Sequence, residues 1–258
     1  MGIFTIVVVF GFVISGSFSD IRSVALLGNN IQSIHAITKE SDAQPLVVGS
    51  GKVLQGTPTS YDFYATVQNN NSDWYATFTY NFSAGSETSR IENGFVMPGE
   101  STYLLSLGYP FTSRPSSPVI TLEDIVWHRV DRHTAPNVQE WLEEHNNFTI
   151  TTPSYAPDID FVNNNIGRTT FTVTNSTPYG YWSPKFVVIL ERAGAVVGVS
   201  TAVLTELEAG DVRLVDVRWY GDLPVTATAK VLPSINYFDA NIYMPPRGIT
   251  GTDIRDFE

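Results

Sequence analysis

The chain has 258 residues, with 26 acidic and 15 basic side chains and a formal net charge of −11. This acidic balance would repel a phosphate backbone, and no cluster of Lys and Arg reverses it locally, which argues against nucleic-acid binding. Cysteine is absent, which excludes a disulfide framework and a thiolate metal site. A hydrophobic content of 43% with 12% aromatic residues, 19 Gly and 15 Pro indicates a globular chain of strands and turns.

An uncharged apolar segment begins at Gly2 and ends at Phe18. Its length is at the lower limit of about 17 residues for a membrane-spanning helix, so residues 1–19 are predicted to be an uncleaved membrane anchor. A cleaved signal peptide is the alternative, because Ser17 and Ser19 provide small residues where a signal peptidase reads the chain. No Lys or Arg precedes the segment, which weakens both interpretations. A start codon assigned too late, or a buried strand, are further alternatives.

Either an anchor or a signal places the rest of the chain outside the cytoplasm. The predicted location is therefore the cell membrane, with a single pass and extracytoplasmic domains, or secretion if the segment is cleaved. Residues 20–45 are predicted to form a stalk.

Residues 46–132 are predicted to form a first β-sandwich. Hydrophobic alternation predicts strands at 60–68 and 74–82, separated by an Asn-rich turn. The second of these strands should direct one set of side chains to the core, namely Trp74, Ala76, Phe78, Tyr80 and Phe82.

Residues 133–147 are predicted to form a linker helix. Thr134 can cap it, Pro136 suits its first turn, and Asn146 is a stop signal. Trp141 falls on the apolar side at helical spacing. It is predicted to pack at the interface between two sandwiches.

Residues 148–246 are predicted to form a second β-sandwich, followed by a flexible tail at 247–258. The segments 186–190 and 195–199 are apolar on both faces. They are predicted to be central strands or strands that meet a partner.

The two predicted sandwiches repeat each other. Val67 and Val173 are 106 residues apart, as are Asn69 and Asn175, and each pair lies in an alternating segment that ends at a turn. A period of about one hundred residues built from short strands is the size of one sandwich, which predicts two tandem copies.

Several motifs carry a resemblance: residues 171–177, Tyr181-Trp182, 208–213, 219–223 and 236–243, with 61–71 as the matching strand of the first copy. Together they resemble a group of membrane-anchored envelope proteins from candidate-phylum (Patescibacteria-like) bacteria, over most of residues 46–243. The resemblance implies one N-terminal membrane helix followed by two immunoglobulin-like or fibronectin-like sandwiches. The chain departs from the group in lacking a Cys-containing segment after that helix and in its shortened N-terminus. The group has no assigned activity, so no residue role is carried over.

Signals for chemistry are weak. His128 and His133 are an odd number of residues apart, so on a strand they would face opposite sides and would not share a metal. Asp158 and Asp160, with Asn163 to Asn165, could offer oxygen ligands to Ca²⁺, but a polar loop is favoured. No catalytic, cofactor-binding or metal-binding residue is predicted, and no cofactor.

The expected function is that of a non-enzymatic scaffold, spacer or adhesion module, tethered to the membrane through the segment from Gly2 to Phe18 and partnered by an envelope protein. A carbohydrate-binding module is the alternative, since aromatic faces stack on sugar rings, and a filament or pilus subunit is a further one. The exposure of Trp74, Trp182 and Trp219 separates the first two hypotheses, because strand tryptophans are more simply core residues.

Overall fold

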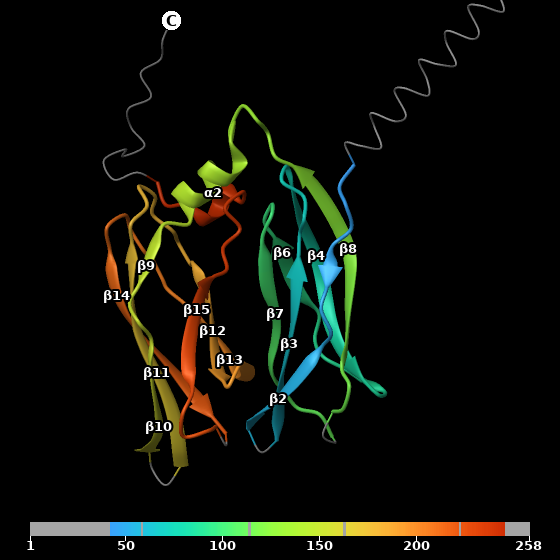
Figure 1. The fold of residues 1–258 in the computed structure, drawn as a ribbon, viewed down its shortest axis with the longest axis vertical. Coiled ribbons are helices and arrows are strands. Elements are labelled where there is room, and N and C mark those ends of the chain that lie inside the picture. Colours follow the sequence, from blue (N-terminus) through green and yellow to red (C-terminus); the bar gives the residue numbers. More distant parts are fainter. Residues whose placement is uncertain (1–41, 58, 113–114, 162–163, 222, 246–258) are drawn as a thin grey trace, which may run out of the picture. The chain divides into compact units, whose positions relative to one another are not determined.

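The computed structural model describes residues 42–57, 59–112, 115–161, 164–221 and 223–245, and the side chains of 158–165 lie outside this description. The described chain is mostly β-strand, and its strands pair antiparallel. The predicted all-β class is confirmed. The strands form four sheets in this part of the chain, and the sheets pack in two pairs (Figure 1).

The first pair of sheets is called sandwich 1. In one sheet β3 lies between β7 and the short strands β1 and β2, and in the other β4 lies between β8 and the short strands β5 and β6. The strands are β1 (Val47–Val48), β2 (Lys52–Thr57), β3 (Ser60–Gln68), β4 (Trp74–Ala84), β5 (Glu87–Thr88), β6 (Glu92–Val96), β7 (Ser101–Tyr109) and β8 (Val119–Arg129).

The core of sandwich 1 is aromatic. Alternate residues of β4 are buried as expected from the sequence, namely Ala76, Phe78, Tyr80 and Phe82, while Trp74 at the start of the strand is only half-buried. Phe63 of β3 stacks on Phe82 with ring centroids 5.6 Å apart. Strand alternation therefore placed this core correctly.

The second pair of sheets is called sandwich 2. In one sheet β11 lies between β14 and the strands β9 and β10, and in the other β12 lies between β13 and β15. The strands are β9 (Phe148–Ile150), β10 (Ser154–Phe161), β11 (Asn164–Asn175), β12 (Lys185–Arg192), β13 (Ala195–Val203), β14 (Val212–Tyr220) and β15 (Thr228–Pro233). The strand β10 was not predicted separately from the sequence. Phe171, Phe186 and Trp219 lie in the core.

The repeated residues Asn69 and Asn175 make corresponding hydrogen bonds in the two sandwiches. Asn69 Nδ2 donates to the main-chain oxygens of Trp74 (2.6 Å) and Met97 (3.1 Å). Asn175 Nδ2 donates to those of Tyr179 (2.7 Å) and Glu208 (2.9 Å). Both side chains are fully buried. Each amide joins the end of one strand to the turn before another, which explains why Asn recurs at this position.

The two sandwiches also pack against each other. Val187 and Ile189, on the side of β12 that faces away from the core of sandwich 2, are buried in a cluster with Leu105 of β7 and Val199 of β13. The β12 strand is thus apolar on both faces because it meets sandwich 1. The described residues from Gln44 onward belong to one compact unit.

The linker contains the helix α2 (Val138–His145). Its cap is not Thr134, as predicted from the sequence, but Asn137, whose Oδ1 accepts from the Glu140 N–H at 3.4 Å. Thr134 lies in a turn instead and its hydroxyl donates to Asp131. Pro136 therefore precedes the cap. Asn146 ends the helix as expected.

The segment from Gly2 to Phe18 lies outside the described residues, as do most of the predicted stalk and the tail at 247–258. Among the described residues, no helix has the length and apolar character needed to cross a membrane.

Candidate functional site

A stack of six aromatic rings, here called the aromatic column, joins sandwich 1, α2 and sandwich 2. Its members in order are His128 (β8), Tyr75 (β4), Phe238 (after β15), Trp141 and His145 (α2), and Tyr179 (before β12). Successive ring centroids are 4.6, 4.7, 4.7, 3.7 and 4.2 Å apart, with interplanar angles of 15°, 18°, 5°, 25° and 16°. The predicted interface position of Trp141 is confirmed.

His145 is the most buried member of the column, with 4% of its surface exposed. Its Nδ1 donates to the Trp141 carbonyl at 2.7 Å. Burial lowers the pKa of the imidazole from 6.5, while the bond to the Trp141 carbonyl and the nearby Glu144 carboxylate oppose this shift. The ring is therefore held between Trp141 and Tyr179 in its neutral form.

Tyrosine hydroxyls secure the junction around the column. Tyr181 donates to the His145 carbonyl at 2.8 Å, Tyr237 to Asn146 Oδ1 at 2.6 Å, and Tyr243 to the Tyr237 carbonyl at 2.7 Å. Burial raises the pKa of all three phenols well above the usual value. The raised pKa values favour the protonated phenols, which act as hydrogen-bond donors at this junction.

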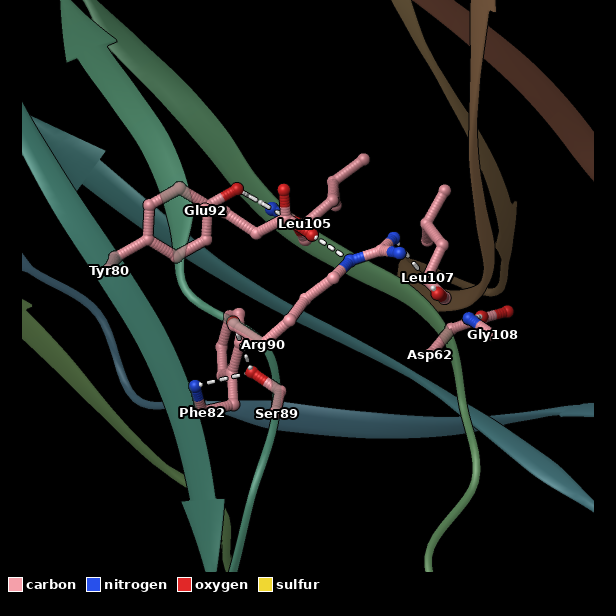
Figure 2. Close-up of polar contacts among 9 residues, drawn as sticks. All are labelled: Asp62, Tyr80, Phe82, Ser89, Arg90, Glu92, Leu105, Leu107 and Gly108. Carbon is pink, nitrogen blue, oxygen red and sulfur yellow. Dashed lines mark hydrogen bonds and ion pairs between the residues drawn. The ribbon is translucent and has the colours of Figure 1, made fainter.

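A second polar arrangement covers the outer edge of β7 (Figure 2). The Tyr80 hydroxyl reaches from β4 to donate to the Leu105 carbonyl (2.7 Å) and accept from the Leu105 N–H (3.1 Å). Arg90, paired with Glu92, donates to the Leu107 carbonyl at 3.5 Å. Burial raises the pKa of the Tyr80 phenol to about 12. These side chains satisfy main-chain groups that an edge strand otherwise presents to a partner.

A small cavity is lined by both sandwiches. Its volume is about 210 Å³, and its polar lining includes Asp62, Ser60, Ser200 and Arg218, with Tyr220 as an aromatic wall. Asp62 Oδ1 accepts from the Gly108 N–H at 2.7 Å (Figure 2). Burial raises the pKa of this carboxyl group, and the Gly108 bond opposes the shift. Ligand pockets usually measure about 300–1,000 Å³, so this cavity is smaller than a usual ligand site, and its lining also includes apolar side chains such as Leu54 and Val199.

A more open groove of about 440 Å³ lies beside the start of α2. It contains an ion pair between Arg132 and Asp73 at 2.8 Å, and the rest of its lining is largely uncharged. The pair satisfies both charges locally.

The structure separates the titratable residues that the sequence analysis considered. His128 Nε2 is 2.9 Å from the Thr77 hydroxyl, whereas His133 is exposed in a turn after β8. His145 lies in the aromatic column. The side chains of Asp158, Asp160 and Asn163 to Asn165 lie outside the described residues. Over the part of the chain that is described, no group of three or more His, Asp or Glu side chains is placed to hold a metal ion.

The three tryptophans differ in exposure. Trp219 is 5% exposed, and its indole N–H donates to the Thr169 hydroxyl at 2.9 Å, so it is a core residue. Trp74 is half-buried below the Arg129 guanidinium, 5.9 Å from its ring centroid. Trp182 is 41% exposed and lies outside the strands. Its expected place in a strand core is therefore wrong.

Phe238 and Tyr179 were not predicted from the sequence as members of the aromatic column. Both occur in aromatic-rich segments, but the column depends on contacts between residues far apart in the sequence, for which a single sequence has no local signal.

No protein-family model matches this chain, and a comparison with curated proteins finds no significant match.

Proposed function

We propose that this chain is a non-enzymatic extracytoplasmic protein, tethered to the membrane through its N-terminal segment, that acts as a rigid scaffold, spacer or adhesion module for an envelope partner. In this proposal each sandwich is immunoglobulin-like or fibronectin-like. The strand order supports this, because the chain passes from the β3 sheet to the β4 sheet, returns at β7 and crosses again at β8, with the same order in sandwich 2.

The observation that carries the proposal is the double attachment between the sandwiches. The aromatic column ties them through α2, and the apolar cluster around Leu105 and Ile189 joins their sheets. A hinge between domains usually has a small and polar interface. A buried apolar cluster between the sheets, together with the stacked column at α2, supports a fixed pair, as a spacer requires.

Distance measurements between two spin labels test this rigidity. The chain has no cysteine, so Thr121→Cys on β8 and Ser154→Cys on β10 would provide the only labelling sites, both exposed. The full chain in mild detergent should give one narrow distance distribution. Adding Trp141→Ala should broaden it, whereas adding Trp182→Ala should not. A broad distribution in the parent protein would contradict the spacer function.

The membrane tether is tested separately. Full-length protein should remain in the membrane fraction after high-salt and alkaline washes. Recovery of a soluble mature chain that begins near Asp20 would replace the anchor with a cleaved signal.

Carbohydrate binding is the second candidate, and the exposed indole of Trp182 is the observation that favours it. If it is correct, a glycan array should show binding that is lost in Trp182→Ala and kept in Trp74→Ala. The absence of glycan binding by the parent chain would remove this candidate.

A further inference from the structure

Edge strands of nine or more residues differ in how they are protected. The described strands of this kind are β7, β8, β13 and β14. The pairing of β7, β8 and β13 with their neighbours contains a register shift in each case. Such bulges twist an edge away from a partner, and β7 is covered by Tyr80 and Arg90 as well (Figure 2).

The β14 strand has no such shift. Its residues pair with β11 in continuous register from Val212 to Tyr220. The long edge that it presents is therefore regular, which is the geometry that pairs with another strand.

The hydrogen bonding of β11 shows which main-chain groups of β14 face outward. The Asn175 N–H donates to the Asp211 carbonyl at 2.9 Å, so Asp211 and every second residue after it bond to β11. The alternate residues, beginning with Val212 and Leu214, direct their N–H and C=O groups to the side of the strand that faces away from β11. Their side chains lie on the solvent face of the sheet, because Val215, Val217 and Trp219 are the buried set.

The exposed side chains of β14 are unusual for a solvent face. Leu214 is 76% exposed and Tyr220 is 56% exposed. Between them lie Asp216, which pairs with Arg168 at 2.5 Å, and Arg218, which has an interaction within its own chain. The exposed side chains along the strand are therefore apolar, acidic, basic and aromatic, in that order. When two such strands run antiparallel, the acidic residue of each lies opposite the basic residue of the other, and the apolar residue lies opposite the aromatic one.

We propose that β14 pairs antiparallel with β14 of a second copy of this chain, about a two-fold axis at Val217. In this register Leu214 faces the second copy's Tyr220, and Asp216 faces its Arg218. The facing residues belong to the set whose main-chain groups point outward, so side-chain complementarity and hydrogen bonding select one register. The contact is isologous and closes as a dimer.

Cysteine pairs test the register directly. In the full chain, in detergent or in its native membrane, the double variant Leu214→Cys with Tyr220→Cys should form a reducible dimer under mild oxidation. Directly opposed residues in such a pair are about 5.5 Å apart between Cα atoms, within the range of a disulfide. Two positions six residues apart on one strand are about 20 Å apart, so neither an intrachain disulfide nor a disulfide-linked dimer of either single variant is expected.

The matched control is Val126→Cys on β8, an exposed apolar residue on an edge that carries a bulge. It should form no disulfide-linked dimer. Disulfide-linked dimers of the single Leu214→Cys variant as abundant as those of the double variant, or a double variant that forms none, would overturn the proposal.

Charge exchange provides an independent test by sedimentation velocity. Asp216→Arg and Arg218→Asp should each weaken dimerisation about tenfold or more, since like charges then face each other. The double exchange should restore dimerisation. The exchanged chain then also has a carboxylate at position 218, opposite its Cα partner Arg168. Circular dichroism would check that each variant is folded. A double exchange that folds but does not dimerise, or a parent chain that is monomeric at high concentration, would contradict pairing through β14.

Discussion

The Trp141 indole of α2 lies almost parallel to the Phe238 ring, with centroids 4.7 Å apart and an interplanar angle of 5°. The two residues are far apart in the sequence and belong to segments on either side of sandwich 2. Their contact holds the linker helix against the segment that follows β15, so the aromatic column depends on both of these segments.

Removing the indole should destabilise the protein. We expect Trp141→Ala to lower the free energy of unfolding by roughly 2–3 kcal/mol, less than the roughly 3–5 kcal/mol typical of a fully buried aromatic residue, because Trp141 is half-buried. A cycle with Phe238→Ala should give a coupling of about 0.5–1.5 kcal/mol. Chemical denaturation measures both, with Trp182→Ala as an exposed control. Additive effects would show that the stacked contact does not stabilise the fold.

Removing the Tyr80 hydroxyl is expected to lower the stability of the protein. Tyr80→Phe leaves the N–H and C=O of Leu105 without their partner inside the protein, which should cost about 1–3 kcal/mol of unfolding free energy. Tyr109→Phe is the control, because the Tyr109 hydroxyl makes no hydrogen bond to a described residue. Faster amide exchange at Leu105 in the variant would locate the effect, and equal stability of the two variants would contradict it.

Ala193 is in a conformation that alanine disfavours. It has φ 51° beside Gly194 at φ 77°, in the two-residue loop between the paired residues Arg192 and Ala195. Asn tolerates this turn better, so Ala193→Asn should raise the unfolding free energy by about 0.5–1 kcal/mol. The same change at Ala195, in a strand, should give no gain. Thermal unfolding compares the two, and a lower melting temperature for Ala193→Asn would count against the argument.

The buried His145 makes stability depend on pH. Burial lowers the pKa of its imidazole in the folded protein below 6.5, while the unfolded chain binds the proton near 6.5. The unfolded state therefore holds more protons in the interval between these two values, and the free energy of unfolding should fall as the pH decreases from 6.5 through the folded pKa. Denaturation at several pH values should show a shallower slope in His145→Gln. An unchanged slope would assign the pH dependence to other groups.

The sequence by itself determined several of the strands and most of their buried side chains. Alternation is a local property, so the spans of β3 and β12 and the inward positions of β4 follow directly from it. The repeat of Asn69 and Asn175 was also visible, because the same hydrogen bonds require the same residue in both copies.

Only the tertiary structure decided which other elements those strands pack against. That both faces of β12 are apolar left open whether the strand was central or met a partner, and the structure shows both: β12 lies between β13 and β15 in its sheet, and its outer face packs on β7. The helix cap is Asn137 and not Thr134, because the Asn137 side chain accepts from the Glu140 N–H while the Thr134 hydroxyl bonds to Asp131 in the preceding turn. The aromatic column and the regular edge of β14 could not be read from the sequence because each depends on long-range neighbours, which residue spacing along one chain does not specify.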